Sequence, residues 1–443
     1  MMKQYDSYKD SGVEWIGKIP SSWKRVRIKY LLSRSSAGVW GDDEKGDAND
    51  IVCFRVADFD YEHGCLSFAK LTYRNIDSKQ LEGRILSLGD LLIEKSGGGE
   101  ATPVGRVVRY NYDDFATCSN FVHSVTVNNN CKSDYLYYYF FAMYANKENL
   151  LFFNQTTGIQ NLKVGEYLSQ TIFLPSLTEQ QAITTYLEKK CGEIDKAIAT
   201  QEKRVELLKE LRQNIITQAV TRGINPDVPF KDSGVEWIGE VPEHWEVNRL
   251  KTLCRTIRNG YVGPTRDLYV DDGIPYIQSV HIKDGEILFE REEYYVTKDW
   301  ADKHPKVYKG DIVVVQTGDI GQIALVTSKF DKCNCHALII LSINNNAILS
   351  EYLSLYLRSH IGKELMLQTK TGALLPHLNS TQIGDTNIIV PPLSEQQEIV
   401  SYIESQTARL DASIEKAEHQ IELLQELKQS IITEVVTGKR KVV

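Results

Sequence analysis

The sequence predicts a mixed α/β protein that contains an internal repeat, with two globular domains and two long helices. Three observations support this fold class. Motifs recur in the same order in both halves of the chain, an apolar heptad spacing follows the last motif of each copy, and short β-rich runs lie between the motifs. The length of 443 residues is consistent with two to four domains.

The repeat is clearest at the ends of each copy. Each copy opens with the pattern DSGVEWIG-x-x-P-x-x-W, continues with a Gly-Asp pair before an apolar run, and closes with P-x-L-[TS]-EQQ. The ends match better than the middles, which indicates a common scaffold that carries two different recognition elements. The three motifs occupy residues 10–23 and 232–245, 89–90 and 310–311, and 175–181 and 391–397.

Each closing motif predicts the start of a long helix. Thr178 and Ser394 are expected N-caps, and Gln181 and Gln397 complete a capping-box pattern three residues later. A 3,4 apolar spacing then runs from Leu187 to Ala219 and, at an offset of 216, from Ile403 to Val435. Such sustained heptads indicate coiled-coil packing, and the alternative is a pair of separate amphipathic surface helices.

Two further features of these helices are predicted from residue type. Gly223 and Gly438 stand where each helix is expected to stop. Additional leucines widen the apolar stripe, which suggests that a third surface is buried against it. These leucines are Leu207, Leu211, Leu423 and Leu427.

The middles of the two copies, residues 24–174 and 246–390, alternate β-rich runs with turns and contain one helix-like stretch each. These stretches begin near Tyr135 and Tyr352. The aromatic cluster at 135–141 could stack on nucleic-acid bases, but packing in a domain core is the favoured interpretation.

Composition restricts the class of protein. The net charge of −8 argues against coating nucleic acid by bulk positive charge, although local basic faces remain possible. No apolar run approaches the roughly 18 residues of a membrane helix, and the N-terminus is polar without a signal-peptide core. The eight cysteines form no C-x-x-C pair, so neither disulfides nor zinc are expected, and a cytoplasmic location without a membrane is predicted.

Several catalytic signatures are missing from the sequence. Neither the phosphate-binding GxxxxGK[ST] loop nor a GxGxxG fingerprint occurs. Asp90, Glu94 and Lys95 could form a metal-dependent nuclease centre. The second copy has Asp311 with Val315 and Gln316 instead, so the cluster is not repeated. Cys333 and Cys335 with the adjacent histidine could be half of a metal site, whereas buried thiols are favoured.

Basic residues concentrate after each opening motif. Arg25 and Arg27 lie in an acid-free stretch that follows the first motif, and Arg249 and Lys251 lie in the corresponding stretch of the second copy. Such clusters can bind phosphates, while the alternative is an ordinary solvated charged face.

Taken together, these motifs resemble the specificity subunit of type I restriction–modification systems. The resemblance covers the whole chain: the paired GVEWIG-x-x-P-x-x-W openings, the Gly-Asp pairs, a Thr-Gly at 157–158 and 371–372, the P-x-L-[TS]-EQQ motifs and the two helices. Each motif is modest alone, but the motifs are specific in duplicate and in order.

The resemblance implies two target-recognition domains that each bind one half of a split site on double-stranded DNA. It also implies that the two helices pack antiparallel with pseudo-two-fold symmetry and dock two methyltransferase subunits, while restriction subunits complete the assembly. The chain itself would then be non-catalytic and bind no cofactor, with S-adenosylmethionine, ATP and Mg expected on partner subunits. The expected segments are 1–176 and 223–392 for the two domains, and 177–222 and 393–443 for the helices.

The candidate DNA contacts are polar side chains in loops at strand ends, where they can reach the edges of bases. Arg25, Arg27, Arg249 and Lys251 are assigned to phosphates. The candidates for base contacts in the first copy are Lys95, Ser96, Arg106, Gln155 and Gln160, and those in the second copy are Gln278, Gln316, Thr317, Lys370, His377 and Asn379.

Two other classes of function remain open at this point. One is a coiled-coil scaffold that binds only proteins, and the other is a self-sufficient DNA enzyme centred on Asp90, Glu94 and Lys95. Enrichment of a split motif from a random duplex pool favours the specificity subunit. Cleavage or methylation by the chain alone favours the enzyme.

Overall fold

The computed structural model of the chain describes residues 4–156, 158–370 and 377–442. The repeated Thr-Gly motifs therefore fall partly outside the described residues, because Thr157, Thr371 and Gly372 are not among them. The chain forms two compact units, one made of Met1–Gln201 with His419–Val443 and the other of Glu202–Glu418. Each unit contains one α/β domain and a segment of both long helices, which confirms the predicted fold class.

The domain of the first unit is built from small, mainly antiparallel sheets. Its largest sheets have the strand orders β12-β10-β14-β4 and β13-β6-β9-β5, with β13 and β6 parallel. The elements are β1 (Tyr8–Asp10), β2 (Lys18–Pro20), β3 (Lys24–Arg27), β4 (Leu32–Ala37), β5 (Asp42–Asp43), β6 (Asp50–Phe54), β7 (Phe59–Asp60), β8 (Cys65–Leu66), β9 (Tyr73–Asn75), α1 (Ser78–Leu81), β10 (Leu91–Glu94), β11 (Ser96–Gly97), β12 (Val107–Arg109), β13 (Ala116–Cys118), β14 (Val122–Val127), α2 (Ser133–Ala145), β15 (Phe153–Thr156), β16 (Ile159–Leu162), α3 (Val164–Tyr167) and β17 (Thr171–Leu174).

The domain of the second unit repeats this plan. The sheet β21-β30-β27-β28 has a central β27 that corresponds to β10 of the first unit, and β23 pairs in parallel with β29. The elements are β18 (Phe230–Asp232), β19 (Glu240–Pro242), β20 (Glu246–Arg249), α5 (Leu250–Leu253), β21 (Cys254–Asn259), β22 (Tyr269–Val270), β23 (Ile274–Ile277), β24 (Ile282–Lys283), β25 (Glu286–Ile287), β26 (Tyr295–Val296), α6 (Lys298–Ala301), β27 (Ile312–Val315), β28 (Ile323–Leu325), β29 (Asn334–Cys335), β30 (Leu338–Ile343), α7 (Ser350–Arg358), α8 (His360–Leu367) and β31 (Asn387–Val390).

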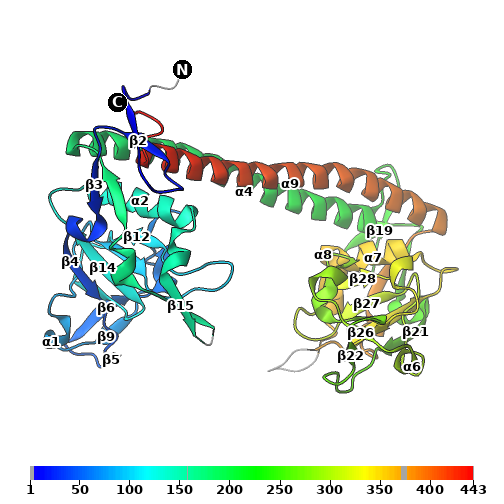
Figure 1. Cartoon of the computed structure of the whole chain (residues 1–443). Helices are drawn as coiled ribbons and strands as arrows, with labels where there is room; N and C mark the ends of the chain where they lie inside the picture. Colours follow the sequence, from blue (N-terminus) through cyan, green and yellow to red (C-terminus); the bar gives the residue numbers. More distant parts are fainter. Residues whose placement is uncertain (1–3, 157, 371–376, 443) are drawn as a thin grey trace. The chain divides into compact units, whose positions relative to one another are not determined.

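The two long helices are α4 (Leu177–Arg222) and α9 (Leu393–Val436), and each unit contains a segment of both (Figure 1). In the second unit, Arg212 Nε donates to Asp411 Oδ1 at 2.8 Å and Lys209 Nζ to Glu418 Oε1 at 2.9 Å. The residue numbers rise along one helix as they fall along the other, so this pairing is antiparallel. It confirms the helix-to-helix packing predicted from the heptads.

The apolar heptad positions of the first unit join the helices to the domain core. Ile183 and Leu187 of α4 and Val435 of α9 are fully buried in one cluster with the aromatic residues of α2. Lys428 Nζ of α9 donates to Asp195 Oδ1 of α4 at 2.6 Å. Burial of apolar surface stabilises by roughly 25 cal/mol per Å², so this shared core holds the two helices against the domain.

The tyrosine-rich segment forms α2 and lies in the core, as predicted. Tyr135 has no exposed surface, and its hydroxyl donates to the backbone oxygens of Phe173 at 3.1 Å and Val436 at 3.2 Å. Tyr352 of α7 does the same in the second unit with Val220 and Ile389. A buried hydroxyl needs a partner, so each tyrosine ties a long helix to its domain.

The start of each long helix differs from the prediction. The helices begin at Leu177 and Leu393, so Thr178 and Ser394 lie inside the first turn and are not the N-caps. In α4 the hydroxyl of Ser176 accepts from the backbone N–H of Glu179 at 3.2 Å, which is the geometry of an N-cap. In α4 the N-cap therefore lies two residues before the predicted one. The sequence pattern alone does not distinguish these two positions, and the backbone conformation decides between them.

The structure explains why Glu-Gln-Gln occurs twice. Gln180 is fully buried; its Oε1 accepts from Lys132 N at 2.8 Å and its Nε2 donates to Pro175 O at 3.0 Å. Gln396 makes the same two bonds, with Leu349 N and Pro391 O. Each glutamine therefore joins the helix start to the beginning of α2 or α7.

Gln180→Leu is expected to lower the free energy of unfolding by about 2 kcal/mol, because one buried N–H and one buried carbonyl lose their partner. Gln396→Leu should lower the free energy of unfolding similarly, because Leu349 N and Pro391 O in the second unit lose their partner. Gln181→Leu is the matched control, since this neighbouring side chain is exposed. Chemical denaturation of the three variants measures the effect, and equal stability of Gln180→Leu and Gln181→Leu would contradict the assigned role.

The opening motif has the same conformation in both units. Trp23 and Trp245 are buried, and their indole N–H groups donate to Glu179 at 3.3 Å and to Glu395 at 3.0 Å. Gly223, with φ +77°, ends α4 directly beneath Trp245. The predicted helix stop is thus confirmed, since a left-handed C′ position favours glycine.

The described residues near each end of the chain, Tyr5 and Lys441 among them, belong to the first unit. The Lys441 ammonium lies 5.5 Å from the ring centroid of Tyr5, and Gly438 packs against Pro20. The last residues of the chain therefore complete the domain that the first residues begin. Among the described residues, no helix is long and apolar enough to cross a membrane.

Candidate nucleic-acid interface

The candidates of the first domain gather around one small sheet. Its strand order is β11-β16-β15, and Ser96 pairs with Asn161 while Gln155 pairs with Gln160. Lys95 directly precedes β11, and its backbone oxygen accepts from Leu162 N at 2.8 Å. A shared strand register, which residue type alone does not specify, brings these side chains together.

Only some of these side chains are free to contact a ligand. Gln155 is exposed, whereas Ser96 and Gln160 are buried. The Ser96 hydroxyl donates to Asn161 Oδ1 at 2.7 Å, and Gln160 Oε1 accepts from Val104 N at 3.1 Å. Ser96 and Gln160 therefore hold the sheet and its loop in place, and their contact with bases stays a prediction.

The glycine-rich run at 97–99 wraps around Gln160. Gly98 has φ +62°, and a Cβ there would lie 2.8 Å from Val104 N and 2.9 Å from Gln160 Oε1. Gln160 Nε2 also donates to the backbone oxygen of Gly99 at 3.3 Å. Glycine is required because both the positive φ and the close approach exclude a side chain. The run shapes a loop at the end of the sheet.

Sequence reasoning missed two exposed amides on the same sheet. Asn154 and Asn161 lie opposite each other on β15 and β16, and both are exposed. Asparagine and glutamine can bond two edge atoms of an adenine at once, so a row of exposed amides suits base recognition. The signal that could have identified them is the hairpin pattern on either side of Gly158.

The half-buried Arg106 forms an ion pair with a buried carboxylate. Its Nε donates to Glu94 Oε2 at 2.9 Å, and its guanidinium lies 3.5 Å from the ring centroid of Tyr61. Glu94 is 1% exposed and also accepts from the Tyr61 hydroxyl at 3.2 Å. Burial and the neighbouring Glu94 carboxylate raise the pKa of Tyr61. The structure therefore favours a structural role for Arg106, and a base contact remains a prediction.

Arg106→Met is expected to lower the free energy of unfolding by about 3–5 kcal/mol, because it leaves the Glu94 carboxylate buried without a counter-ion. The double variant Glu94→Met with Arg106→Met should recover much of this loss, since neither charge is then buried alone. Thermal and chemical unfolding provide the measurement. Normal stability of the single variant, combined with loss of DNA binding, would instead identify Arg106 as a DNA contact.

His123 is a residue of β14 and lies beside Lys95. Burial and the Lys95 ammonium lower the pKa of His123 to about 4, so this imidazole is neutral at neutral pH. Its Nε2 is 2.8 Å from the hydroxyl of Ser35. The His123 imidazole therefore adds no positive charge beside Lys95.

In the second domain, most candidates lie on one pair of loops. Gln316 and Thr317 follow β27 at the position where Lys95 and Ser96 follow β10. The backbone oxygen of Gln316 accepts from Leu378 N at 3.0 Å, which brings the loop with His377 and Asn379 alongside. Thr317, His377 and Asn379 are exposed, and Gln316 is half-buried.

The two remaining candidates stand apart from this pair of loops. Gln278 follows β23 in a different sheet and donates from Nε2 to the Tyr269 hydroxyl at 2.8 Å. Lys370 is exposed next to the end of α8. Their contact with DNA stays a prediction, as does that of Gln316, Thr317, His377 and Asn379.

The four cations assigned to phosphates differ between the units. Arg25 and Arg27 are exposed on β3 and make no ion pair with the described residues. In the second unit, Lys251 Nζ donates to Asp385 Oδ1 at 2.7 Å, and Arg249 donates to the backbone oxygen of Asp385. Free arginines can bind phosphate without first breaking an ion pair, so Arg25 and Arg27 are the better phosphate candidates.

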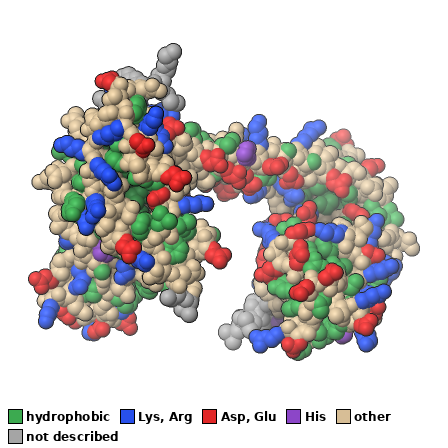
Figure 2. Space-filling model, viewed as in Figure 1, with side chains coloured by type: hydrophobic (Ala, Val, Ile, Leu, Met, Phe, Trp, Pro, Cys, Tyr) green, Lys and Arg blue, Asp and Glu red, His purple; other side chains and the backbone are tan. Residues whose placement is uncertain are grey.

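On the face of each domain seen in Figure 2, charge alone does not mark a nucleic-acid surface. Figure 2 shows lysine and arginine side chains interspersed with aspartate and glutamate on the visible face of each domain. Recognition would then depend on specific side chains at strand ends, with local cations for phosphate contact.

The alternative catalytic centres are not supported by the geometry. The Asp90 carboxylate is bound by Arg34 and by the Thr126 hydroxyl at 2.6 Å, and Glu94 is bound by Arg106. Asp311, which corresponds to Asp90, is likewise buried beside Arg258, and burial raises its pKa. The repeated Gly-Asp motif thus supplies a buried structural carboxylate.

The cysteine pair behaves as predicted for buried thiols. Cys333 and Cys335 are buried and free, and burial raises their pKa values to about 11 and about 12. Within the part of the chain that the structure describes, no group of three or more His, Cys, Asp or Glu side chains could hold a metal ion.

Comparisons with known proteins agree with the duplicated plan. A family model described as the type I restriction modification DNA specificity domain matches residues 49–209 and 242–423. The EcoBI specificity subunit of a type I restriction enzyme from Escherichia coli is 28% identical over 274 residues, which cover 60% of this chain and 57% of that protein. The MjaIX specificity subunit from Methanocaldococcus jannaschii is 24% identical over 444 residues, covering 96% of this chain and 95% of that protein.

One solved structure has the same fold over nearly the whole chain. It comes from work on complex assembly and conformational transition of a type I restriction–modification system. The TM-score is 0.68 at 17% identity, and the match covers 94% of this chain and 98% of that chain.

Proposed function

The chain belongs to the family of type I restriction–modification DNA specificity proteins, and we propose that its two domains each recognise one half of a split site on double-stranded DNA. As a specificity subunit it is not an enzyme by itself. Methyl transfer and cleavage would belong to partner subunits, which would also bind S-adenosylmethionine, ATP and Mg.

One observation carries this proposal: equivalent strands of a repeated scaffold end in different side chains. Lys95 and Ser96 follow β10, whereas Gln316 and Thr317 follow β27. The cores and helix starts are alike in the two units, so the scaffold does not require this difference. Two domains that share a scaffold but present different side chains at the ends of equivalent strands are suited to two different half-sites.

The reading surface of the first domain is assigned to the β15–β16 hairpin. Asn154, Gln155 and Asn161 present exposed amides there, and Asn161 is oriented by the Ser96 hydroxyl. Amides of this kind reach base edges in the major groove, while Arg25 and Arg27 would hold the phosphates.

The test is selection of bound duplexes from a random pool by the full chain together with its methyltransferase partner. A split motif should be enriched. Asn154→Ala with Asn161→Ala should relax the first half only, at a cost of about 1–3 kcal/mol, whereas Arg25→Gln should weaken all sequences equally and reduce the salt dependence. Absence of any enriched motif would leave the protein-binding scaffold as the function.

The methyltransferase subunits are proposed to dock on the long helices. Leu207 and Leu211 of α4 are 52% and 47% exposed, and Leu423 and Leu427 of α9 are 49% and 47% exposed. Each pair is spaced i, i+4 and presents an apolar stripe that the chain leaves uncovered. The two pairs occupy equivalent positions in the repeat, so each unit would carry one docking stripe.

Leu207→Asp with Leu211→Asp is expected to weaken methyltransferase binding by at least tenfold, because a buried charge opposes association. Glu206→Ala with Glu210→Ala is the matched control on neighbouring exposed positions of the same helix. Analytical ultracentrifugation of the reconstituted complex would report the loss of one of two bound subunits. Full occupancy would place the docking surface elsewhere.

A further inference from the structure

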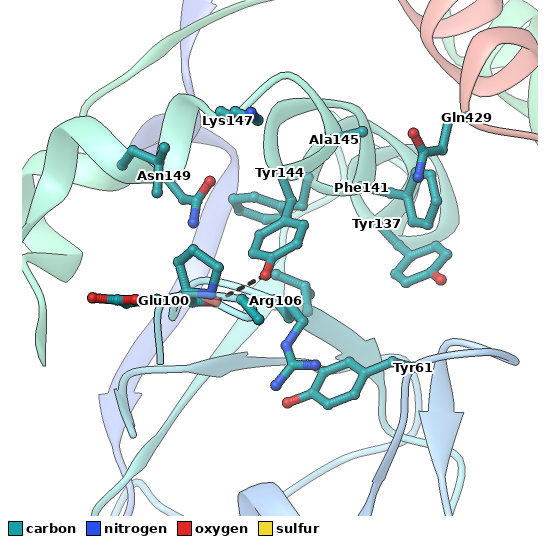
Figure 3. A pocket seen from close by; sticks show the side chains of 15 residues that line it. Tyr61, Glu100, Arg106, Tyr137, Phe141, Tyr144, Ala145, Lys147, Asn149 and Gln429 are labelled. Atoms are coloured by element: carbon teal, nitrogen blue, oxygen red, sulfur yellow. Dashed lines mark hydrogen bonds between the residues drawn. The ribbon is translucent and has the colours of Figure 1, made fainter. Parts of the chain in front are cut away.

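A large cavity lies within the first unit between α2, the loop of residues 100–106 and the last turns of α9. Its volume is about 590 Å³, which is in the range of pockets that hold small molecules. Figure 3 shows Tyr137, Phe141 and Tyr144 projecting from α2, with Tyr61 and Arg106 across from them and Gln429 contributed by α9. The DNA-binding hairpin assigned above does not line this cavity.

Aromatic rings form much of the wall of the cavity, and the hydroxyls of two of its tyrosines are hydrogen-bonded. The Tyr144 hydroxyl donates to Pro103 O at 2.9 Å, and the Tyr61 hydroxyl donates to Glu94. The Arg106 guanidinium is stacked on Tyr61 and paired to Glu94, so it is fixed before any ligand arrives. Such walls offer ring faces and a planar cation to a flat heteroaromatic group.

Three polar groups at the cavity have no partner among the described residues. The Lys147 ammonium, the Glu100 carboxylate and the Gln429 amide are exposed, and none of them makes a side-chain hydrogen bond or ion pair. Lysine binds phosphate as a point charge, a carboxylate accepts from ribose hydroxyls, and an amide can bond the edge of a base.

We propose that this cavity binds a nucleotide, with the base among the aromatic rings and the phosphate at Lys147. A nucleotide would contact the aromatic rings, the Lys147 ammonium and the Gln429 amide at the same time. An aromatic side chain of a partner protein would fill the walls but leave Lys147 and Glu100 unpaired. The proposal stands on the cavity alone and does not depend on DNA recognition by the domains.

The nucleotide could be free in solution or part of a DNA strand with an unstacked base. Both sources share the same chemistry, and a competition experiment separates them. Displacement of bound AMP by a single-stranded ten-residue oligo(dA) would show that a base within a strand can enter. No displacement would restrict the site to free nucleotides.

The test is isothermal titration of the full chain with AMP and with adenosine. Lys147→Asn should weaken AMP about fivefold to tenfold and leave adenosine unchanged, because only the phosphate contact is lost. Asparagine tolerates the left-handed backbone of residue 147, which has φ 61°. Phe141→Leu should weaken both ligands, since it removes one ring from the wall.

Lys163→Asn is the matched control, because Lys163 is an exposed lysine of the same domain that does not line the cavity. Its affinity for AMP should equal that of the unmodified chain. Lys147→Asn should also select the same split DNA site, which separates this proposal from the proposed function. The nucleotide site is overturned if none of AMP, GMP, CMP and UMP binds saturably, or if Lys147→Asn and Phe141→Leu leave AMP binding unchanged.

Discussion

Replacing residues 232–390 with the corresponding segment of a specificity protein that binds another site is expected to change the second half-site and leave the first unchanged. The exchanged segment begins after α4 and ends before α9, so both long helices stay intact. The Tyr352 hydroxyl bonds Val220 O and Ile389 O, so the incoming segment needs a tyrosine at that position.

The expected effect is large because base contacts determine specificity. Specific binding of DNA typically exceeds non-specific binding by about 10³–10⁷, so a changed second domain should abolish selection of the original full site. Selection from a random pool measures both half-sites in one experiment. A folded chimera that loses both half-sites would show that the two domains do not recognise DNA independently.

Insertion of four residues into both long helices is expected to lengthen the gap between the half-sites by about two base pairs. Four helical residues add about 6 Å at 1.5 Å per residue, and DNA rises about 3.4 Å per base pair. The sites for insertion are after Val205 in α4 and after Ala417 in α9, which lie in one apolar cluster of the second unit. Matched insertions keep the antiparallel pairing at Arg212 and Asp411 in register.

The physical basis is that α4 is a single uninterrupted helix from Leu177 to Arg222, although its residues are divided between the two units. We expect this helix to set the distance between the two recognition domains, and half-sites about one helical turn apart, 34–36 Å, are expected. Selection from a library with randomised gaps gives the measurement, and both half-sites should be unchanged. An unaltered gap in a folded, partner-bound variant would mean that the helices do not set the spacing.

Much of the scaffold could be predicted from sequence, because its signals are local or repeated. The heptad stripe from Leu187 to Ala219 identified α4, and the buried Ile183, Leu187 and Val205 confirm the face that packs. The stripe drifts near its end, where Ile216 is buried in place of the expected Ile215. A helix has 3.6 residues per turn, so a strict seven-residue count slips by one position over several turns.

The site was only partly predictable, because residue type and loop position do not specify long-range pairing. Gln155 and Gln160 are candidates for the same reason and pair across the hairpin, yet Gln155 on the edge strand is exposed while Gln160 on the central strand is buried against Val104. Arg106 is a candidate base contact by residue type and loop position, and the fold pairs it with Glu94, twelve residues away. Neither outcome has a local signature in the sequence.

By itself the sequence determined the duplication, the two long helices, the closing glycines and the absence of familiar catalytic motifs. These depend on the order of residues and on helical periodicity, which act over a few turns of chain. The tertiary structure decided which polar side chains are free, that Gln180 and Gln396 lock the helix starts, and that an aromatic cavity opens beside α9. Those features arise from contacts between distant segments, and only the packed core fixes their geometry.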